Sequence, residues 1–305
     1  MDFEEFLWVL GMEQEIIDRA KECVSEKKEL PETLYEKFSE LYRICAAVGG
    51  MPECVKKYVE TADLEQCRKI QADILSDYRE DIQKYAVGND KTRATACLDS
   101  IPKQLASGYS RFRYLDIENR TNAGFREYST SIEWLKGAGI IELCYALDAP
   151  VYPLSAGKKP KTFKIYMKDT GLLISMLDRK TVAALIFRDT GVDLGTVMEN
   201  AICESLTKTG FKAMYFERNG RLEIDFIIDL GSNIAAVEVK TGKGRTALSL
   251  NRLMSEFNMI GIRFEDSNIF TDDKGITHYP LFTSSFFYPE KIELKADYKH
   301  LVKKE

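Results

Sequence analysis

Histidine and paired cysteines are scarce in this sequence. Its 305 residues include only His278 and His300 as histidines, and none of its 7 cysteines forms a CxxC pair. A reaction that needs a histidine base would therefore depend on one of these two residues, and neither stands in a recognisable catalytic pattern. Scattered cysteines in odd number are typical of reduced thiols packed as small apolar side chains. We therefore expect neither a disulfide framework nor a zinc site.

Long apolar runs are also absent. No stretch approaches the roughly 20 apolar residues that a transmembrane helix needs. The opening Met1-Asp-Phe-Glu-Glu-Phe6 is acidic and amphipathic, unlike a signal peptide or a transit peptide. We therefore expect a cytoplasmic location and no membrane partner.

A phosphate-binding loop of the GxxxxGK[S/T] type is missing too. The nearest stretch, Lys240-Thr-Gly-Lys-Gly-Arg245, has glycine where Ser or Thr belongs and lacks the first glycine of the motif. It is predicted to be a flexible turn after a strand. The chain therefore has no expected ATP site, and we do not expect it to hydrolyse ATP by itself.

What is present is the composition of a globular protein with an uneven distribution of charge. Hydrophobic residues make up 45% of the chain and charged residues 30%, and its length suits two or three domains. Residues 1–90 carry 12 Lys and Arg against 21 Asp and Glu, residues 91–168 carry 13 against 7, and residues 169–305 carry 18 against 20. A basic middle part is what a segment facing nucleic acid would have. The alternative is a few lysines on one exposed loop.

The spacing of apolar residues predicts an α+β protein of several domains. Residues 1–90 have the helical period of three to four, with one helix ending at Gly49-Gly50 and a longer one over 64–85. Residues 91–168 are predicted to form two helices and then two strands, which is the order of a winged helix. The loop between these strands, Ile140–Ala146 and Phe163–Met167, carries the candidate nucleic-acid-binding residues Lys158, Lys159 and Lys161.

Residues 169–305 are predicted to form an α/β domain, because helical and strand-like segments alternate there. The expected helices cover about 171–177, 196–209 and 248–257. The expected strands are Ala213–Glu217, Glu223–Asp229, Ile234–Thr241 and Ile260–Phe264.

Two of these strands carry residues that suit metal-dependent chemistry. Alternation along 234–241 places Glu238 and Lys240 on one face, and Asp225 is expected opposite Ile224 and Phe226 in its own strand. Pairing of the two strands would bring Asp225 beside Glu238. Two carboxylates so placed repel one another unless a cation lies between them, and oxygen ligands suit Mg²⁺ or Mn²⁺.

Glu199, on the preceding helix, is the candidate third metal ligand beside Asp225 and Glu238. Lys240 would orient or deprotonate an attacking water, or stabilise the charge that builds on a phosphate. The candidate catalytic residues are therefore Asp225, Glu238, Lys240 and Glu199. The alternative is a satisfied cluster of salt bridges at a sheet edge, without any ion.

The arrangement of Asp225 and Glu238-x-Lys240 resembles the metal site of the PD-(D/E)XK nuclease superfamily. Further stretches, in order along almost the whole chain, resemble the C-terminal part of bacterial AAA-type ATPases of the DUF4143 (AAA_14) group. They include Asp2-Phe-Glu-Glu-Phe-Leu-Trp8, Gly49-Gly-Met-Pro-Glu53, Trp134-Leu-Lys-Gly-Ala-Gly139 and Tyr279-Pro-Leu-Phe282.

This resemblance implies that residues 169–305 form a PD-(D/E)XK nuclease-like domain and that residues 1–90 are the helical link to an ATPase core. Full-length members of the group begin with a P-loop domain that this sequence lacks. The resemblance therefore implies an expressed piece, a shortened gene or one half of a split protein.

The resulting hypothesis is a DNA-associated, Mg²⁺- or Mn²⁺-dependent nuclease-like domain, which would act as a phosphodiesterase. The alternative is a non-catalytic module that binds nucleic acid or protein for an ATPase. The expected partners are DNA and the missing ATPase domain or another protein.

Overall fold

The computed structural model describes residues 1–118, 123–189, 191–220, 222–242 and 247–290. His300 and most of the turn that follows Lys240 lie outside these residues. The helices are α1 (Phe3–Val9), α2 (Gln14–Glu26), α3 (Glu32–Val48), α4 (Pro52–Thr61), α5 (Leu64–Tyr85), α6 (Asp90–Ala106), α7 (Leu115–Glu118), α8 (Phe125–Gly137), α9 (Thr170–Ser175), α10 (Arg179–Phe187), α11 (Gly195–Lys208) and α12 (Leu248–Phe257), with 3₁₀ turns η1 (Leu154–Gly157) and η2 (Leu281–Phe286). The strands are β1 (Ile141–Leu147), β2 (Lys158–Met167), β3 (Met214–Arg218), β4 (Leu222–Asp229), β5 (Ile234–Val239), β6 (Ile260–Glu265), β7 (Phe270–Thr271) and β8 (Thr277–Pro280).

The strands of the described residues form one mixed sheet in the order β2-β1-β3-β4-β5-β6-β8-β7. Strands β3, β4 and β5 form an antiparallel meander, and β5 pairs with β6 in parallel. The β1–β2 hairpin joins this sheet because β1 pairs in parallel with β3, with Tyr145 opposite Met214. The boundary predicted between residues 168 and 169 therefore falls within one hydrogen-bonded sheet, and the structure supports a mixed α and β class.

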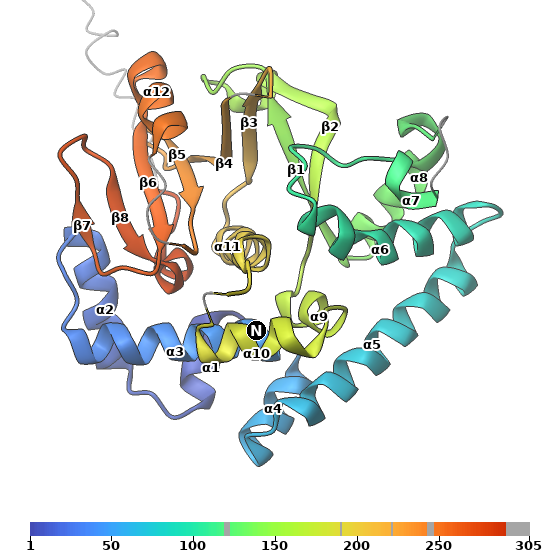
Figure 1. Ribbon diagram of the computed structural model, residues 1–305, viewed down its shortest axis with the longest axis horizontal. Helices are drawn as coiled ribbons and strands as arrows, with labels where there is room; N and C mark the ends of the chain where they lie inside the picture. Colours follow the sequence, from blue (N-terminus) through green and yellow to red (C-terminus); the bar gives the residue numbers. More distant parts are fainter. Residues whose placement is uncertain (119–122, 190, 221, 243–246, 291–305) are drawn as a thin grey trace, which may run out of the picture.

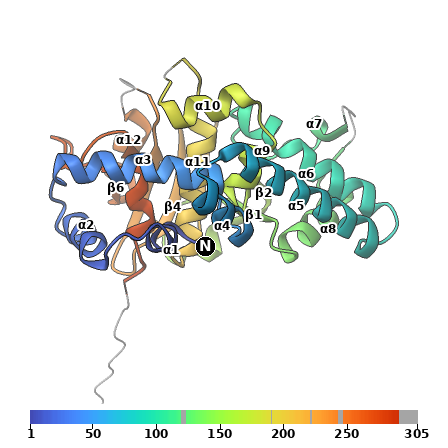
Figure 2. The same cartoon turned by 90° about the horizontal axis from the view of Figure 1, so that it is seen from below.

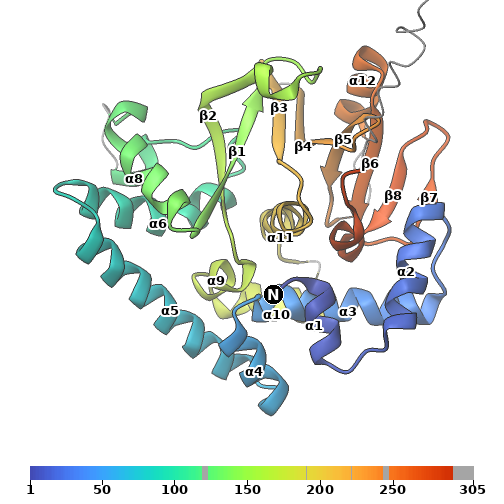
Figure 3. The same ribbon diagram turned by 180° about the vertical axis from the view of Figure 1, so that it is seen from behind.

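Helices cover both faces of this sheet (Figures 1 and 3). On one face α11 packs against apolar side chains of β4 and β5, among them Phe226, Val237 and Val239. On the opposite face Leu250 and Leu253 of α12 pack against Ile224 and Ala236. Helices α6 and α8 form a separate core with the hairpin, and in Figure 1 they lie beside β1 and β2.

The N-terminal helices pack against the layer that contains α9, α10 and α11, and Figure 2 shows α3 running across this layer. The contact is close where Gly49 meets Gly171: a Cβ added to Gly171 would lie 2.6 Å from the Gly49 Cα. Asp169 fixes the same junction, because its carboxylate accepts hydrogen bonds from Gly50 N at 2.7 Å and from Leu172 N at 3.0 Å. These contacts tie the end of α3 to the start of α9.

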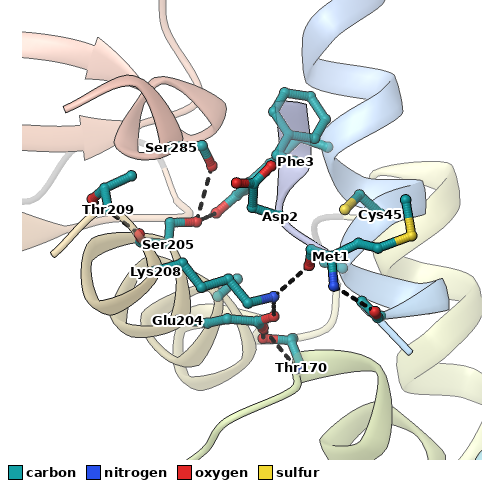
Figure 4. Close-up of a pocket in the computed structure, with 15 residues that line it drawn as sticks. Met1, Asp2, Phe3, Cys45, Thr170, Glu204, Ser205, Lys208, Thr209 and Ser285 are labelled. Carbon is teal, nitrogen blue, oxygen red and sulfur yellow. Dashed lines mark hydrogen bonds and ion pairs between the residues drawn. The ribbon is translucent and has the colours of Figure 1, made fainter. Parts of the chain in front are cut away.

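A small cavity of about 30 Å³ lies beside this junction (Figure 4). The Met1 amine donates to Gly50 O at 2.6 Å, and Lys208 of α11 donates to Met1 O at 2.6 Å and contacts Glu204 at 2.5 Å. The cavity has room for one or two water molecules and no larger ligand. It is therefore a packing gap at the junction.

Most expected elements are present, with some differences in length and number. The helix predicted over 64–85 is α5 and the one over 248–257 is α12. Helix α3 ends at Val48 and is capped by Gly49, whose φ of 77° suits glycine. Helix α10 and strands β7 and β8 were not predicted. Strand β2 begins at Lys158, so the three lysines expected in a loop lie in the strand. None of the described helices has both the length and the apolar character needed to cross a bilayer.

Candidate functional site

A cleft of about 1540 Å³ lies at the ends of the central strands and contains all four predicted catalytic residues. Glu199 comes from α11, Asp225 from β4, and Glu238 from β5, with Lys240 directly after that strand. The other walls are the C-terminal end of α6, residues 108–109 and 111–112, and residues 188–189 and 191–196 before and at the start of α11. The four residues named from the sequence thus line one cleft.

Asp225 lies in a β-bulge. Strands β3 and β4 pair Phe216 with Ile224 and Met214 with Ile227, so one residue of β3 stands opposite two of β4, Asp225 and its successor. Bulges of this kind redirect side chains and often lie next to active sites. The predicted alternation is therefore wrong at this point, because Ile224 packs in the core under α12 whereas Phe226 packs in the core under α11.

Backbone pairing between β4 and β5 also stops next to Asp225. The last ladder pair of these strands is Phe226 with Val237, which leaves Asp225 and Glu238 as the next neighbours. Beyond this pair the Val239 N–H donates to Asp225 Oδ2 at 2.8 Å instead of to the β4 backbone. At the edge of the cleft, the Asp225 carboxylate thus accepts the hydrogen bond that a backbone carbonyl of β4 would otherwise accept.

Glu238 lies between two cations. Its Oε1 is 3.2 Å from Lys240 Nζ, which confirms that these side chains share a face, and its Oε2 is 3.6 Å from Arg263 Nε. Glu238 is only 7% exposed, and its Oε2 accepts no hydrogen bond from the described residues. Strand β5 lies between β4 and β6, so this group is in the middle of the sheet and not at a sheet edge as the alternative reading supposed.

The charged groups continue from Glu238 towards β8. Arg263 Nε lies 3.4 Å from Glu265 Oε2, and Glu265 Oε1 lies 2.8 Å from His278 Nδ1. His278 is buried and stacks on Phe270, with ring centroids 4.1 Å apart. Arg263, which lines the cleft, was not identified from the sequence as a member of the site.

Glu199 has a different set of partners. Its Oε1 lies 2.9 Å from Lys164 Nζ and accepts a hydrogen bond from the Tyr166 hydroxyl. Lys164 Nζ also lies 2.9 Å from Glu223 Oε1, although the lysine is only 8% exposed. Both Lys164 and Tyr166 belong to β2, which the sequence prediction did not connect to the site.

The two ion-pair groups lie towards opposite faces of the sheet. Val237 and Val239 pack with α11, so Glu238 between them points to the α12 face. Tyr166 packs in the same core as α11, and its partner Glu199 is on α11 itself. The cleft at the strand ends contacts both the Glu238 group and the Glu199 group, and Asp225 in the bulge lies between these two groups.

Burial and neighbouring charges shift the proton affinities in this cleft. Burial, followed by the charge of Glu199, raises the pKa of Asp225 to about 7, against the lowering effects of Lys164 and of the Val239 N–H. Burial alone would lower the pKa of Lys164, but the carboxylates of Glu199, Asp225 and Glu223 raise it well above its ordinary value. Lys164 is therefore a permanent cation in this group, whereas Asp225 exchanges its proton near neutral pH.

The lysines at the start of β2, which we call the β2 lysines (Lys158, Lys159 and Lys161), do not line the cleft. Lys158 Nζ lies 3.5 Å from the centroid of the Tyr145 ring, and Lys159 pairs with Asp148 at 3.2 Å. Lys161 Nζ lies 5.8 Å from the centroid of the Phe125 ring. These contacts hold the lysines against the hairpin and α8, away from the predicted catalytic residues.

The sequence hypothesis places a cation between Asp225 and Glu238, although the charge that acts most strongly on Asp225 is that of Glu199. Within the described ranges, no three His, Cys, Asp or Glu side chains are grouped closely enough to hold an ion together. The buried Glu238 Oε2 accepts no hydrogen bond from the described residues, and Arg263 Nε lies 3.6 Å from it. A divalent cation at this oxygen would replace Arg263 as its charge partner. Such an ion would take its remaining oxygen ligands from water or from a phosphate.

Comparison with protein families assigns two regions of the chain. Residues 194–280 match the model of a domain of unknown function, DUF4143, as the resemblance in the sequence led us to expect. Residues 39–183 match a second domain of unknown function, DUF8612. Comparisons with curated proteins and with solved structures found no match. The four predicted catalytic residues lie in the DUF4143 region, and Lys164 and Tyr166 lie in the DUF8612 region.

Proposed function

We propose that the cleft is the site of a metal-dependent phosphodiesterase that acts on DNA, in a domain of the PD-(D/E)XK nuclease-like type. The single observation that carries the proposal is that Glu199, Asp225, Glu238 and Lys240, chosen from the sequence for this chemistry, all line one cleft. The order of elements from α11 through β3, β4, β5, α12 and β6 supports it, since acidic residues lie on the helix and on two adjacent strands.

Asp225 and Glu238 would hold a Mg²⁺ or Mn²⁺ ion, which when bound polarises a phosphate oxygen and lowers the pKa of a bound water. Lys240 is a quarter exposed and lies at the cleft wall, so its N–H groups can bind a non-bridging phosphate oxygen while Glu238 orients its side chain. In the reaction, a water oxygen forms a bond to phosphorus, the ester P–O bond breaks, and the leaving sugar oxygen takes up a proton.

The test is incubation of the purified protein with plasmid DNA and Mg²⁺ or Mn²⁺. We expect cleavage that falls by at least about 100-fold in Asp225→Asn and in Lys240→Met, the usual scale for loss of a catalytic group. Asp273→Asn, an exposed acid outside the cleft, is the matched control and keeps full activity. Cleavage that persists unchanged in Asp225→Asn would come from a contaminant and would refute the proposal.

One observation favours a second candidate function, a non-catalytic module that binds DNA or protein for an ATPase. Lys240 and Arg263 already lie within 3.2 and 3.6 Å of the Glu238 carboxylate and can balance its charge without an ion. This candidate predicts salt-sensitive DNA binding without cleavage in either metal. The ATPase partner would be a separate P-loop chain or domain of the DUF4143 group.

A further inference from the structure

Two lysines from different elements lie against one aromatic ring outside the candidate cleft. The Nζ atom of Lys158, at the start of β2, is 3.5 Å from the centroid of the Tyr145 ring. That of Lys136, in the last turn of α8, is 5.4 Å from the same centroid. The face of an aromatic ring attracts a cation. The exposed side chain of Lys158 is therefore held in place by this ring.

A third lysine, Lys212, reaches the same face of the sheet from the segment before β3. It is exposed and stands between Phe211 and Ala213, whose side chains pack in the core that contains α11. Alternation of side chains places Lys212 on the opposite face, together with Met214. Met214 packs in the core under α12 and pairs directly with Tyr145, so Tyr145 lies on that face too.

These three residues, which we call the lysine cluster (Lys136, Lys158 and Lys212), act on one another electrostatically. Burial lowers the pKa of Lys158, and the charges of Lys136 and Lys212 lower it further, against the raising effect of Glu133. In the part of the chain that the structure describes, no member of the cluster forms an ion pair. Like charges gathered in this way repel one another, and an anion beside them offsets the repulsion. The cluster therefore favours an anionic ligand.

The lysine cluster lies at the same level of the sheet as the candidate cleft. Lys158 is opposite Leu147 of β1, which is itself opposite Phe216 of β3. Phe216 is opposite Ile224 of β4, and Ile224 directly precedes Asp225 of the cleft. Strands β2, β1, β3 and β4 are consecutive in the sheet (Figure 3). With neighbouring strands about 4.8 Å apart, the cluster is roughly 14 Å from the cleft. That distance corresponds to about four nucleotides of a DNA strand, at roughly 3.4 Å each.

We propose that the lysine cluster binds the phosphate backbone of a DNA duplex whose adjoining nucleotides reach the candidate cleft. The inference deepens the proposed function on which it rests, since it names the surface that holds the DNA, but it requires neither a metal ion nor cleavage. It also changes the set of residues named from the sequence, because Lys159 is already paired with Asp148 at 3.2 Å. The cluster joins the two family regions, with Lys212 in the DUF4143 region and the other two members in the DUF8612 region.

The experiment measures binding of a fluorescein-labelled DNA duplex by anisotropy over a series of salt concentrations, with EDTA present so that no metal-dependent cleavage occurs. We expect the triple variant Lys136→Gln, Lys158→Gln and Lys212→Gln to lower the slope of log affinity against log salt concentration by about two to three. Its affinity at about 0.1 M salt should fall at least tenfold. The double variant Lys159→Gln and Lys161→Gln should lower the slope by less than about one.

A matched control changes the net charge equally on another part of the surface. It replaces three exposed lysines of the N-terminal helices, in the variant Lys37→Gln, Lys56→Gln and Lys69→Gln. This control should keep the wild-type slope. An equal loss of slope in the control and in the cluster variant would show that net charge alone attracts DNA, and would overturn the inference. Lys212→Gln alone lies outside any helix or strand and should lower the slope by about one, which keeps the test decisive if the triple variant does not fold.

The remaining outcomes separate this inference from the proposed function. Binding that depends on the lysine cluster, without cleavage after Mg²⁺ or Mn²⁺ is added, would support the inference and refute the phosphodiesterase. Cleavage with an unchanged salt slope in the cluster variant would refute the inference and leave the phosphodiesterase standing. Binding to phosphatidylserine vesicles in place of DNA would assign the cluster to a membrane surface and would also overturn the inference.

Discussion

Replacement of Asp225 by Asn gives a test that needs neither substrate nor metal. Burial and the charge of Glu199 raise the pKa of this carboxyl from an ordinary value of 3.8 to about 7. Asn has nearly the same shape, and its side-chain oxygen can still accept from the Val239 N–H, which donates to Asp225 at 2.8 Å. The substitution therefore removes the charge and leaves the hydrogen bond at the bulge.

The sign of the effect follows from proton linkage. The folded protein holds the Asp225 proton to a higher pH than the unfolded chain, so the contribution of this residue to stability falls as pH rises from about 4 to 7. The difference between a pKa of 3.8 and one of about 7 corresponds to roughly 4 kcal/mol of destabilisation well above pH 7. We expect Asp225→Asn to be stabilised relative to wild type at pH 8, by several kcal/mol at most, and to differ little at pH 4.

Urea unfolding with EDTA present, followed by circular dichroism at several pH values, measures this difference. The exposed Asp273→Asn variant is the control and should follow the wild type throughout. Mn²⁺ at pH 8 is expected to stabilise the wild type and to stabilise Asp225→Asn much less, since the variant keeps only Glu238 of the two proposed carboxylate ligands. A stability difference between Asp225→Asn and wild type that is the same at every pH would refute the argument from burial.

Three further outcomes are expected. Gly171→Ala should lower the free energy of unfolding by about 2 kcal/mol or more, because the new Cβ would lie 2.6 Å from backbone atoms. Gly137→Ala is the control and should be neutral, because its Cβ would meet no atom within 4 Å. Thermal unfolding compares the two variants. Joint replacement of the β2 lysines by Gln should reduce the slope of log affinity for DNA against log salt concentration, by an amount that corresponds to up to about three phosphate contacts. Fluorescence anisotropy measures this slope. An unchanged slope would show that the β2 lysines do not contact DNA. Arg263→Met should destabilise the metal-free protein by about 3 kcal/mol, and Mn²⁺ should recover part of this loss.

The sequence is most informative about helices with a long apolar stripe. Helix α5 agrees with its expected bounds because its buried side chains recur from Cys67 to Ile82, over about four turns. Helix α10 has only nine residues and a weakly amphipathic pattern, and strands β7 and β8 have two and four residues. Such short elements form because neighbouring strands and helices complete their hydrogen bonds and cores, which local periodicity does not report.

The candidate site was only partly predictable for a related reason. Glu238 lies in β5 and Lys240 directly follows this strand, so the alternation of side chains in extended backbone fixes their relative position. Lys164 and Arg263 come from β2 and β6, and sequence spacing does not indicate that either would contact the site. A usable signal existed: each is a charged residue within an apolar strand, in Phe163-Lys-Ile-Tyr and Ile262-Arg-Phe, and a buried cation requires an acidic partner.

The shared sheet also bears on whether the chain behaves as three domains. Strand β1 pairs with β3 across the boundary between the two family regions, and the Met167 backbone exchanges hydrogen bonds of 2.8 and 3.1 Å with the Asn200 side chain. Without β1, the edge of β3 would expose its backbone groups, and without Met167 the buried Asn200 would lose two of its three hydrogen bonds. If one family region unfolded alone, the other region would lose most of its stability. We therefore expect a single cooperative unfolding transition on heating. Two calorimetric transitions, only one of them shifted by Gly171→Ala, would show that the regions unfold independently despite these contacts.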